Sequence, residues 1–514
     1  MKKNRWYRIL FTKRLLAILL ILIQLAYLVI IIVNSRQAFR WINLSLNILG
    51  VLVALYVLAI RDVPEYKLLW ALIITAVPIF GATFYLLFNF QRSTHTLRKK
   101  TEDARACLRP GFKGKEEMAD KAALAHPAGQ TLLHYLEQTE GFPVYDDTEI
   151  EYFSGGESYW EAILRELQKA EKTIWLEYFI IQEGKMWNRI LDILKEKAAA
   201  GVDVRVLYDD LGCFLLLPSD YPKQLRQMGI RCEVFNPFRP FLSSKQNNRD
   251  HRKILSIDGR VAFTGGTNLS DEYINAAGKD FHWKDCGILL RGKAALSLTL
   301  IFLQLWSVVS GDDLAADMSL LPTPEEVAVP TSAPIFVQPY GSEPLIASTV
   351  GENVYMHMIA SAKKSLYIFT PYLIIGDAML QALCRAAKSG VDVRIVTPGR
   401  PDKKLVYITT RSYYTELIAA GVKIYEYTPG FIHSKIMVCD GEMATVGTVN
   451  LDFRSLFLHY ECGTVLYGSE AVRTVWEDAE ATFPQCHLVG ENEHRRTFFN
   501  TIPRAILRLI SPLM

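Results

Sequence analysis

The sequence predicts an α/β protein in which two similar repeats pack as one unit behind an N-terminal transmembrane helical anchor. Three observations support this prediction. Residues 1–100 contain long apolar runs, residues 158–210 and 354–399 alternate amphipathic helices with apolar strands, and one short motif occurs twice. Alternating helices and strands favour a sheet covered on both faces. The chain has 514 residues, of which 50% are hydrophobic, so it is more apolar than a typical soluble protein.

The anchor is predicted from three apolar runs of membrane-spanning length, at 15–33, 41–60 and 68–88. Each run has almost no charge, as expected for a segment that crosses a bilayer. A cleaved signal peptide is the alternative for the first run, but no small-residue cleavage site follows Val33 and two more runs come after it. We therefore expect a multi-pass protein of the cell membrane.

The orientation of the anchor is ambiguous, because basic residues flank both of its ends. They are Lys2, Lys3, Arg5, Arg8, Lys13 and Arg14 before the first run, and Arg92, Arg98, Lys99 and Lys100 after the third. Positive charge marks the cytoplasmic side, and three spans cannot leave both ends inside. Either one run is re-entrant or lies along the interface, or one basic flank faces outward. We expect the rest of the chain on the cytoplasmic face.

The two repeats follow the anchor. Each contains an amphipathic helix and a buried strand, at 158–181 and 354–375, and then a second helix and strand. The segment Gly-Val-Asp-Val-Arg occurs in both, starting at Gly201 and at Gly390. Such self-similarity indicates a duplicated unit.

A linker is predicted between the repeats, at 311–344, where the chain is proline-rich and poorly periodic. We place the boundary near Thr323. The first repeat is then 101–322 and the second 323–514.

The duplicated motif lies at 251–268 and 433–450. Its members are His251, Lys253, Asp258, Gly265 and Asn268 in the first copy, and His433, Lys435, Asp440, Gly447 and Asn450 in the second. Residues two apart in a strand share a face, so each copy presents an imidazole beside an ammonium group. Lysines, asparagines and the free amides of glycine-rich backbone together predict a phosphate-binding site formed by Lys253, Asn268, Lys435 and Asn450.

The two aspartates of the motif allow a structural interpretation. Asp258 and Asp440 each precede a glycine between two apolar alternating runs, which is a strong hairpin-turn signal. The residues alone therefore favour a turn-forming role for both.

A catalytic histidine needs an orienting partner on its second ring nitrogen, usually a carboxylate. The sequence offers one in each half: Asp285 in KDCGILL and Glu461 in YECGTVL, each at the start of a matching strand. A single acid at a strand end is usually solvated, but two at equivalent places favour His-carboxylate dyads.

Other functional classes have little support. The net charge of +3 is too small to indicate a nucleic-acid partner, and no basic stripe with interleaved aromatics is present. The eight cysteines include no close Cys-x-x-Cys pair, so we expect buried free thiols rather than disulfides or a metal site.

The pattern His-x-Lys-x4-Asp-x6-Gly-x-x-Asn, twice in one chain, resembles the signature of the phospholipase D superfamily. More narrowly, the chain is similar to the bacterial cardiolipin synthases over nearly its whole length. The matching segments are 78–88, 176–180, 201–210, 369–374, 447–461 and the ending RLISPLM. The resemblance implies two phospholipase D-like α/β repeats packed as one catalytic unit.

The resemblance also implies an activity. One histidine attacks the phosphodiester of phosphatidylglycerol, glycerol leaves, and a second phosphatidylglycerol takes up the phosphatidyl group to give cardiolipin. No cofactor or metal is required, and the partners are phosphatidylglycerol and membrane lipid. The implied catalytic residues are His251 as nucleophile, His433 as general acid, and Lys253, Asp258, Lys435 and Asp440.

Two features depart from the family pattern. Gly266 stands where the first copy more often has serine, which removes one hydroxyl near the phosphate. The anchor has an additional apolar run. A phospholipase D hydrolase or a phosphatidyltransferase with another acceptor alcohol shares the same catalytic residues, and a nuclease or an inactive scaffold is a more distant alternative.

The C-terminal segment TIPRAILRLISPLM predicts a short amphipathic helix from Ile502. Thr501 can cap this helix and Pro503 is tolerated in its first turn. Arg504 and Arg508 share one face. The opposite face carries Ile502, Ile506, Leu509, Ile510 and Leu513. The helix either packs on the core of the protein or lies in the headgroup layer of a membrane.

Overall fold

The structure is a computed structural model. It describes Leu22 and residues 37–60, 62–89, 92–112, 116–237, 247–329, 335–346, 348–491, 493 and 498–513. Apart from Leu22, the apolar run predicted at 15–33 lies outside the described residues. The chain divides into two units, of which one holds residues 1–96, 238–247 and 505–513 and the other holds 97–237 and 248–504.

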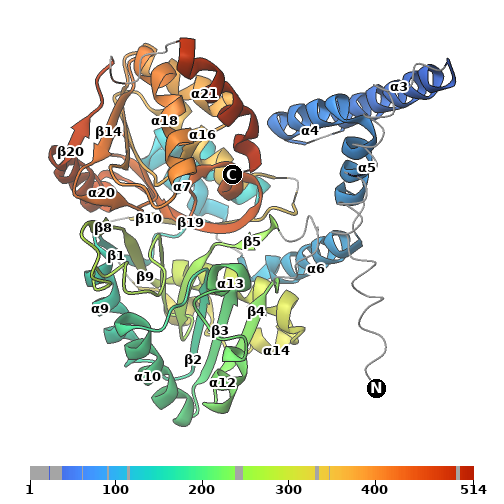
Figure 1. Cartoon of the computed structure of the whole chain (residues 1–514). Helices are drawn as coiled ribbons and strands as arrows, with labels where there is room; N and C mark the ends of the chain where they lie inside the picture. The colour runs from blue at the N-terminus through green and yellow to red at the C-terminus, as the bar shows by residue number, and fades with distance from the viewer. Residues whose placement is uncertain are drawn as a thin grey trace, which may run out of the picture. The chain divides into compact units, whose positions relative to one another are not determined.

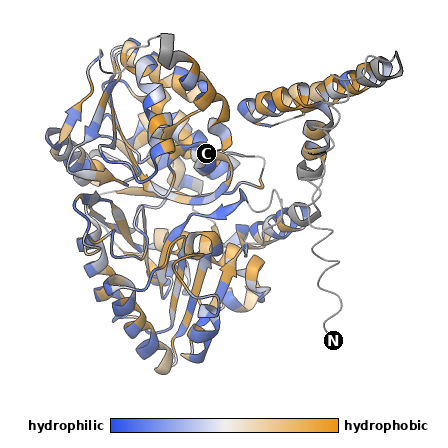
Figure 2. Cartoon of the chain, viewed as in Figure 1, coloured by the Kyte–Doolittle hydropathy of each residue, from blue (hydrophilic) through white to orange (hydrophobic). Residues whose placement is uncertain are grey.

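Among its described residues, the first unit contains three helices from the predicted anchor: α3 (Gln37–Ala59), α4 (Pro64–Ala76) and α5 (Pro78–Asn89). Ala54 and Val57 of α3 pack with Ile74 of α4 and with Ala82 and Tyr85 of α5. The ribbons of α3 and α4 are largely apolar in Figure 2. Exposed apolar side chains on α3 include Leu44, Ile48, Leu52 and Leu55.

The third apolar run does not form one helix. It breaks at Val77, whose φ of −137° and ψ of 72° leave the helical region directly before Pro78. The 13 residues of α4 and the 12 of α5 each extend only about 20 Å at 1.5 Å per residue, less than the hydrocarbon thickness of a bilayer. The prediction of a single spanning helix at 68–88 is therefore wrong.

The second unit contains two mixed sheets (Figure 1). The first sheet has the order β1-β9-β7-β6-β2-β3-β4. Its strands are β1 (Thr148–Phe153), β2 (Thr173–Tyr178), β3 (Asp203–Asp209), β4 (Arg231–Phe235), β6 (Lys253–Ile257), β7 (Val261–Gly265) and β9 (Gly287–Gly292). The second has the order β10-β19-β17-β16-β11-β13-β14-β20. Its strands are β10 (Phe336–Ser342), β11 (Ser365–Phe369), β13 (Asp392–Pro398), β14 (Lys423–Tyr427), β16 (Ile436–Cys439), β17 (Met443–Gly447), β19 (His459–Tyr467) and β20 (Cys486–Leu488).

The two sheets repeat one topology. In each, three strands are parallel, β2-β3-β4 and β11-β13-β14, and the strands on the other side run antiparallel. The helices of the first repeat are α9 (Gly156–Leu167), α10 (Lys185–Ala199), α11 (Asp210–Cys213) and α12 (Tyr221–Gln227), and those of the second are α16 (Val350–Ser361), α17 (Asp377–Lys388), α18 (Lys404–Ala419), α19 (Phe453–Phe457) and α20 (Ser469–Thr482). The predicted duplication of an α/β unit is confirmed.

Helix α13 (Lys293–Ser310) covers one face of the first sheet, with Phe302 stacked on Trp175 of β2. By length and composition it could also cross a membrane, but 78% of it is buried. It is therefore a core helix of the second unit.

The predicted linker is shorter than expected. It contains α14 (Leu314–Met318) and α15 (Pro324–Val327), but its last part, from Phe336, is strand β10. This strand pairs with β19 at the edge of the second sheet. An edge strand tolerates Pro339, because a proline there removes no hydrogen bond that a central strand needs.

Two short strand pairs join the repeats. Strand β5 (Arg249–Asp250) runs parallel to the start of β19, and β15 (Gly430–Ile432) runs parallel to β8 (His282–Lys284). Each of β5 and β15 directly precedes a motif histidine. The histidine of one repeat is therefore fixed beside the other repeat.

Helix α21 (Phe498–Ile510) begins before the predicted start at Ile502, so Thr501 is not its cap and Pro503 lies inside it. Its apolar stripe is exposed: Ile502 is 60% exposed, Ile506 54% and Leu513 58%. The alternative of an apolar face buried on the core does not hold for these side chains.

The cysteines are all free. Six of them are buried, as predicted, whereas Cys107 is exposed and Cys486 is half-buried.

Candidate active site

The two motif histidines lie at the ends of β5 and β15, where the strand pairs between the repeats end. The His251 amide donates to the Tyr460 carbonyl at 2.9 Å, and the His433 amide donates to the Lys284 carbonyl at 2.7 Å. The side chains of His251 and His433 are only 9% and 7% exposed. Both imidazoles are thus held in a nearly dry interior.

The lysines lie beside their histidines, as the two-residue spacing predicts. The Lys253 ammonium donates to the His251 carbonyl at 2.6 Å, and Lys435 donates to the His433 carbonyl in the same way. The repeat therefore places two imidazoles and two ammonium groups in one cluster.

The orienting acids are exchanged between the repeats. His251 Nδ1 lies 2.9 Å from Glu461 Oε1 and 3.1 Å from Oε2, and His433 Nδ1 lies 2.7 Å from Asp285 Oδ2. The sequence offers one acid in each half, but each acid contacts the histidine of the other half. The cause is the pairing of β5 with β19 and of β15 with β8, which brings each histidine next to the opposite acid.

The two carboxyl groups are held differently. Glu461 accepts hydrogen bonds from the hydroxyls of Thr448 and Ser455, whereas Asp285 accepts from the Cys286 amide at 2.8 Å. A Cβ at Gly266 would lie 2.1 Å from Asp285 Oδ1. Gly266 is therefore explained: the carboxyl group of Asp285 fills the space that a side chain would need.

Burial governs protonation in this cluster. It lowers the pKa of His433 to about 4 and the pKa of His251 well below 6.5, and the nearby lysines add to both shifts. Burial also raises the pKa of Glu461 to about 8 and lowers the pKa of Lys253 to about 8 and of Lys435 to about 7. The His251–Glu461 pair therefore shares one proton, and an anion entering the site would favour the charged lysines.

The asparagines of the motif differ from each other. The Asn268 side chain accepts from the Ile180 amide at 3.0 Å and donates to the Tyr273 hydroxyl at 2.7 Å. The Asn450 side-chain oxygen is buried without a hydrogen-bond partner among the described residues. Because an amide oxygen accepts hydrogen bonds, only the NH2 group of Asn450 could donate to a bound phosphate.

A buried ion pair fixes β5. Asp209 at the end of β3 accepts from Arg249 Nη2 at 2.8 Å and from the Asp250 amide at 3.0 Å. Both Arg249 and Asp209 are almost completely buried. This pair holds the backbone immediately before His251.

The aspartates of the motif occupy hairpin turns. Asp258 and Gly259 have φ of 54° and 63°, and Asp440 and Gly441 have 55° and 67°, as the Asp-Gly signal predicts for a two-residue turn. Asp440 accepts from the backbone amides of residues 363–365 at 2.7 to 2.9 Å. Asp258 does the same with residues 171–173. Neither carboxylate has a described contact with an imidazole of the cluster.

This geometry gives a stability prediction for Asp440. Asp440→Ala removes the acceptor of three backbone amides and places an alanine at positive φ. We therefore expect the free energy of unfolding to fall by about 1–3 kcal/mol. Turnover per folded molecule should change by less than about threefold, because the turn does not touch the imidazoles. Thermal unfolding and specific activity measure the two effects.

Asp440→Asn, which keeps an acceptor oxygen and tolerates positive φ, is the matched control. A loss of activity above about 10³-fold at unchanged stability would assign Asp440 to the chemistry.

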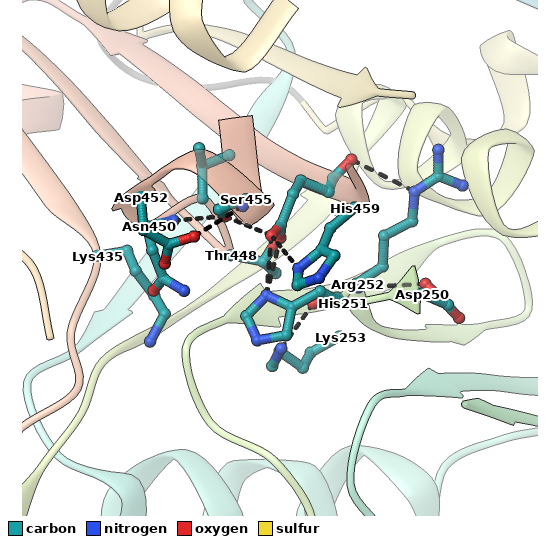
Figure 3. A network of polar contacts seen from close by, with 12 residues as sticks. Asp250, His251, Arg252, Lys253, Lys435, Thr448, Asn450, Asp452, Ser455 and His459 are labelled. Atoms are coloured by element: carbon teal, nitrogen blue, oxygen red, sulfur yellow. Dashed lines mark hydrogen bonds and ion pairs between the residues drawn. The ribbon is translucent and has the colours of Figure 1, made fainter. Parts of the chain in front are cut away.

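His459 is a site residue that the sequence does not predict. It begins β19, two residues before Glu461, and its ring centroid lies 5.6 Å from that of His251 (Figure 3). The signal in the sequence is the same two-residue spacing that pairs His251 with Lys253, since alternate residues of a strand share a face.

Comparisons with known proteins place the chain in a family. A family model described as "Cardiolipin synthase, PLD-like domain" matches residues 163–280 and 355–482. The chain is 37% identical over 455 residues to cardiolipin synthase 2 of Bacillus cereus, covering 88% of this chain and 87% of that protein. It is 38% identical over 456 residues to a cardiolipin synthase of Alkalihalophilus pseudofirmus, covering 88% and 89%.

The fold is also similar to a solved structure. Phosphatidylserine synthase of Haemophilus influenzae superposes with a TM-score of 0.55 at 13% identity, covering 71% of this chain and 95% of that one. This similarity concerns the fold alone.

Proposed function

The chain belongs to the cardiolipin synthases of the phospholipase D superfamily, and from that membership we propose that it transfers a phosphatidyl group from one phosphatidylglycerol to another. The products are cardiolipin and glycerol. One observation carries the proposal: two buried imidazoles, each with a carboxyl group from the other repeat and a lysine beside it, lie in one cluster.

The first step forms a phosphohistidine. Nε2 of His251 attacks phosphorus, because its Nδ1–H is held by Glu461 and the lone pair on Nε2 is free. The negative charge of the bound phosphodiester favours the protonated form of His433. The bond from phosphorus to the glycerol oxygen breaks, and His433 gives its proton to that oxygen. Lys253, Lys435 and Asn450 stabilise the charge on the phosphoryl oxygens.

In the second step the proton moves in the opposite direction. His433, now neutral, removes the proton from a hydroxyl of a second phosphatidylglycerol. The resulting oxygen attacks phosphorus, the bond to His251 breaks, and cardiolipin leaves. Near-complete burial of both imidazoles supports transfer over hydrolysis, because it limits the access of water to the phosphohistidine.

The broken third run supports a membrane arrangement. We propose that 15–33 and 41–60 span the bilayer and that α4 and α5 form a re-entrant pair, since each is too short to cross. Two spans return the chain to the side on which it began. In this proposed arrangement both basic flanks lie on the cytoplasmic side, as the distribution of positive charge favours, and the catalytic unit lies in the cytoplasm.

The function is tested by giving purified full-length protein vesicles of phosphatidylglycerol alone and identifying the lipid by mass spectrometry. We expect cardiolipin and an equal amount of glycerol. Phosphatidic acid as the main product would indicate a hydrolase. Product only after addition of another alcohol would indicate a different acceptor.

Helix α21 gives a prediction about substrate form. Its exposed stripe, Ile502, Ile506 and Leu509, has the chemistry of a helix that lies in the headgroup layer. Deleting residues 502–514 should lower activity on vesicles by more than about tenfold, since burying even one such side chain contributes about 1.5–3 kcal/mol. Activity on a short-chain soluble phosphodiester should change little. Ile506→Glu is the matched point variant. An equal loss on both substrates, with a lower melting temperature, would show that the helix only stabilises the fold.

A further inference from the structure

His459 is a buried imidazole without a described role in the reaction above. Its side chain is 11% exposed, and its Nδ1 lies 3.8 Å from Glu461 Oε1, beyond hydrogen-bond distance. Neither ring nitrogen has a hydrogen-bond partner in the described part of the chain. A buried polar group left without a partner is destabilising. The two nitrogens are therefore available to a molecule that enters the site.

The position of His459 is fixed by the strand pairs between the repeats. His459 pairs with Arg249 in β19 and β5, and Trp283 pairs with Phe431 in β8 and β15. These pairings are equivalent, so Trp283 takes the place of His459 in the other half. Its ring centroid lies 5.6 Å from that of His433, the same separation as between His459 and His251. At this one position the neighbour of His251 is a histidine, whereas the neighbour of His433 is a tryptophan.

The charge around His459 indicates what it binds. One nitrogen or oxygen from each of His251, His459 and Glu461 lies within 4.8 Å of the others, which is a donor set that could hold a cation. Burial lowers the pKa of His459 well below 6.5, and the positive charges of Arg454, Lys253, Arg249 and Lys403 add to this shift. The same charges repel a cation and attract an anion. A neutral imidazole here supplies one N–H donor to an anionic oxygen.

We propose that His459 is a further catalytic residue, which donates its N–H to a non-bridging oxygen of the phosphodiester while His251 attacks phosphorus. This rests on the proposed function and on His251 as the nucleophile. His459 forms no covalent bond and transfers no proton. Phosphorus bound to the ring of His251 comes close to the neighbouring ring of His459, and the negative charge on its oxygens increases at the transition state. A preorganised donor at such an oxygen typically contributes 10²–10³-fold to the rate.

The test uses three variants of the full-length protein in detergent. His459→Phe keeps a planar ring without a donor, and His459→Asn keeps a donor in a smaller side chain. His357→Phe is the matched control, because His357 is a half-buried histidine on α16 outside the site, whose ring stacks on Tyr135. Orthovanadate binding by calorimetry reports the oxyanion site. The burst of nitrophenol from a short-chain nitrophenyl phosphodiester reports attack by His251.

We expect His459→Phe to weaken vanadate binding by about tenfold and to slow the burst by about 10²-fold. His459→Asn should recover at least a tenth of the wild-type burst rate, and His357→Phe should match the wild type in both measurements. Wild-type vanadate affinity and burst rate in His459→Phe would overturn the proposal. So would an equal loss in His459→Phe and His459→Asn, because shape rather than a donor would then be required.

The outcome is separable from the test of function. Vanadate binding does not depend on which lipid is formed, so loss of binding in His459→Phe supports the role of His459 even if the wild type makes no cardiolipin. If the wild type makes cardiolipin and His459→Phe shows unchanged vanadate binding and an unchanged burst rate, His459 is not the proposed donor. The proposed function then still stands.

Discussion

Replacing either His251 or His433 by alanine should abolish turnover rather than halve it. The two imidazoles lie in one cluster with acids exchanged between the repeats, so the molecule has one site that needs both. Loss of a nucleophile or of the acid that serves it typically costs more than 10³-fold. Cardiolipin formation by each purified variant measures this effect. His487→Ala, at an exposed histidine on β20, is the control for histidine removal.

The same variants assign the two roles. A nitrophenyl phosphodiester has a leaving group that needs no proton, so His433→Ala should still form the phosphohistidine but resolve it slowly. The adduct should accumulate on His251 and be found there by mass spectrometry. His251→Ala should form none. Half of the wild-type activity in either variant would refute the shared site, and an adduct on His433 would reverse the roles.

Glu461→Gln should cut the rate by about 10²-fold or more without unfolding the protein. Glutamine keeps the size of the side chain, but it cannot stabilise the positive charge that His251 gains during attack. Asp285→Asn is the matched change at His433. Because the acids are exchanged, Glu461→Gln should slow the burst and Asp285→Asn should mainly slow resolution of the adduct.

Pre-steady-state kinetics separate these steps. If Glu461→Gln slowed only resolution, Glu461 would serve His433, and the contact at 2.9 Å with His251 would not be the functional one. An unchanged rate in both variants would make the acids structural. The melting temperature of each variant shows whether lost activity is due to misfolding. This control is needed because Glu461 is completely buried and accepts hydrogen bonds from the hydroxyls of Thr448 and Ser455.

Much of the fold and part of the site could be predicted from the sequence. The repeated helix-strand pattern and the two His-x-Lys copies depend on local spacing, which the chain shows directly. The partners of the two acids could not be predicted, because they depend on β5 meeting β19 and β15 meeting β8 across the molecule. Spacing along one repeat carries no information about such long-range pairing.

The errors have equally local causes. Pro78 breaks the third apolar run, and a hydropathy window does not register that break. His459 was missed because it occurs in one copy only, where its counterpart is Trp283. A comparison of the two copies emphasises what they share and overlooks the residues in which they differ.

The exchanged acids also determine when a newly made chain becomes active. His251 needs Glu461, which is synthesised 210 residues later. A nascent chain that has folded only its first repeat carries His251 and Lys253 but lacks the carboxyl group that orients the imidazole. On the proposed mechanism, catalysis therefore begins only after the second repeat has emerged from the ribosome and folded against the first, and an unfinished chain cannot act on phospholipids.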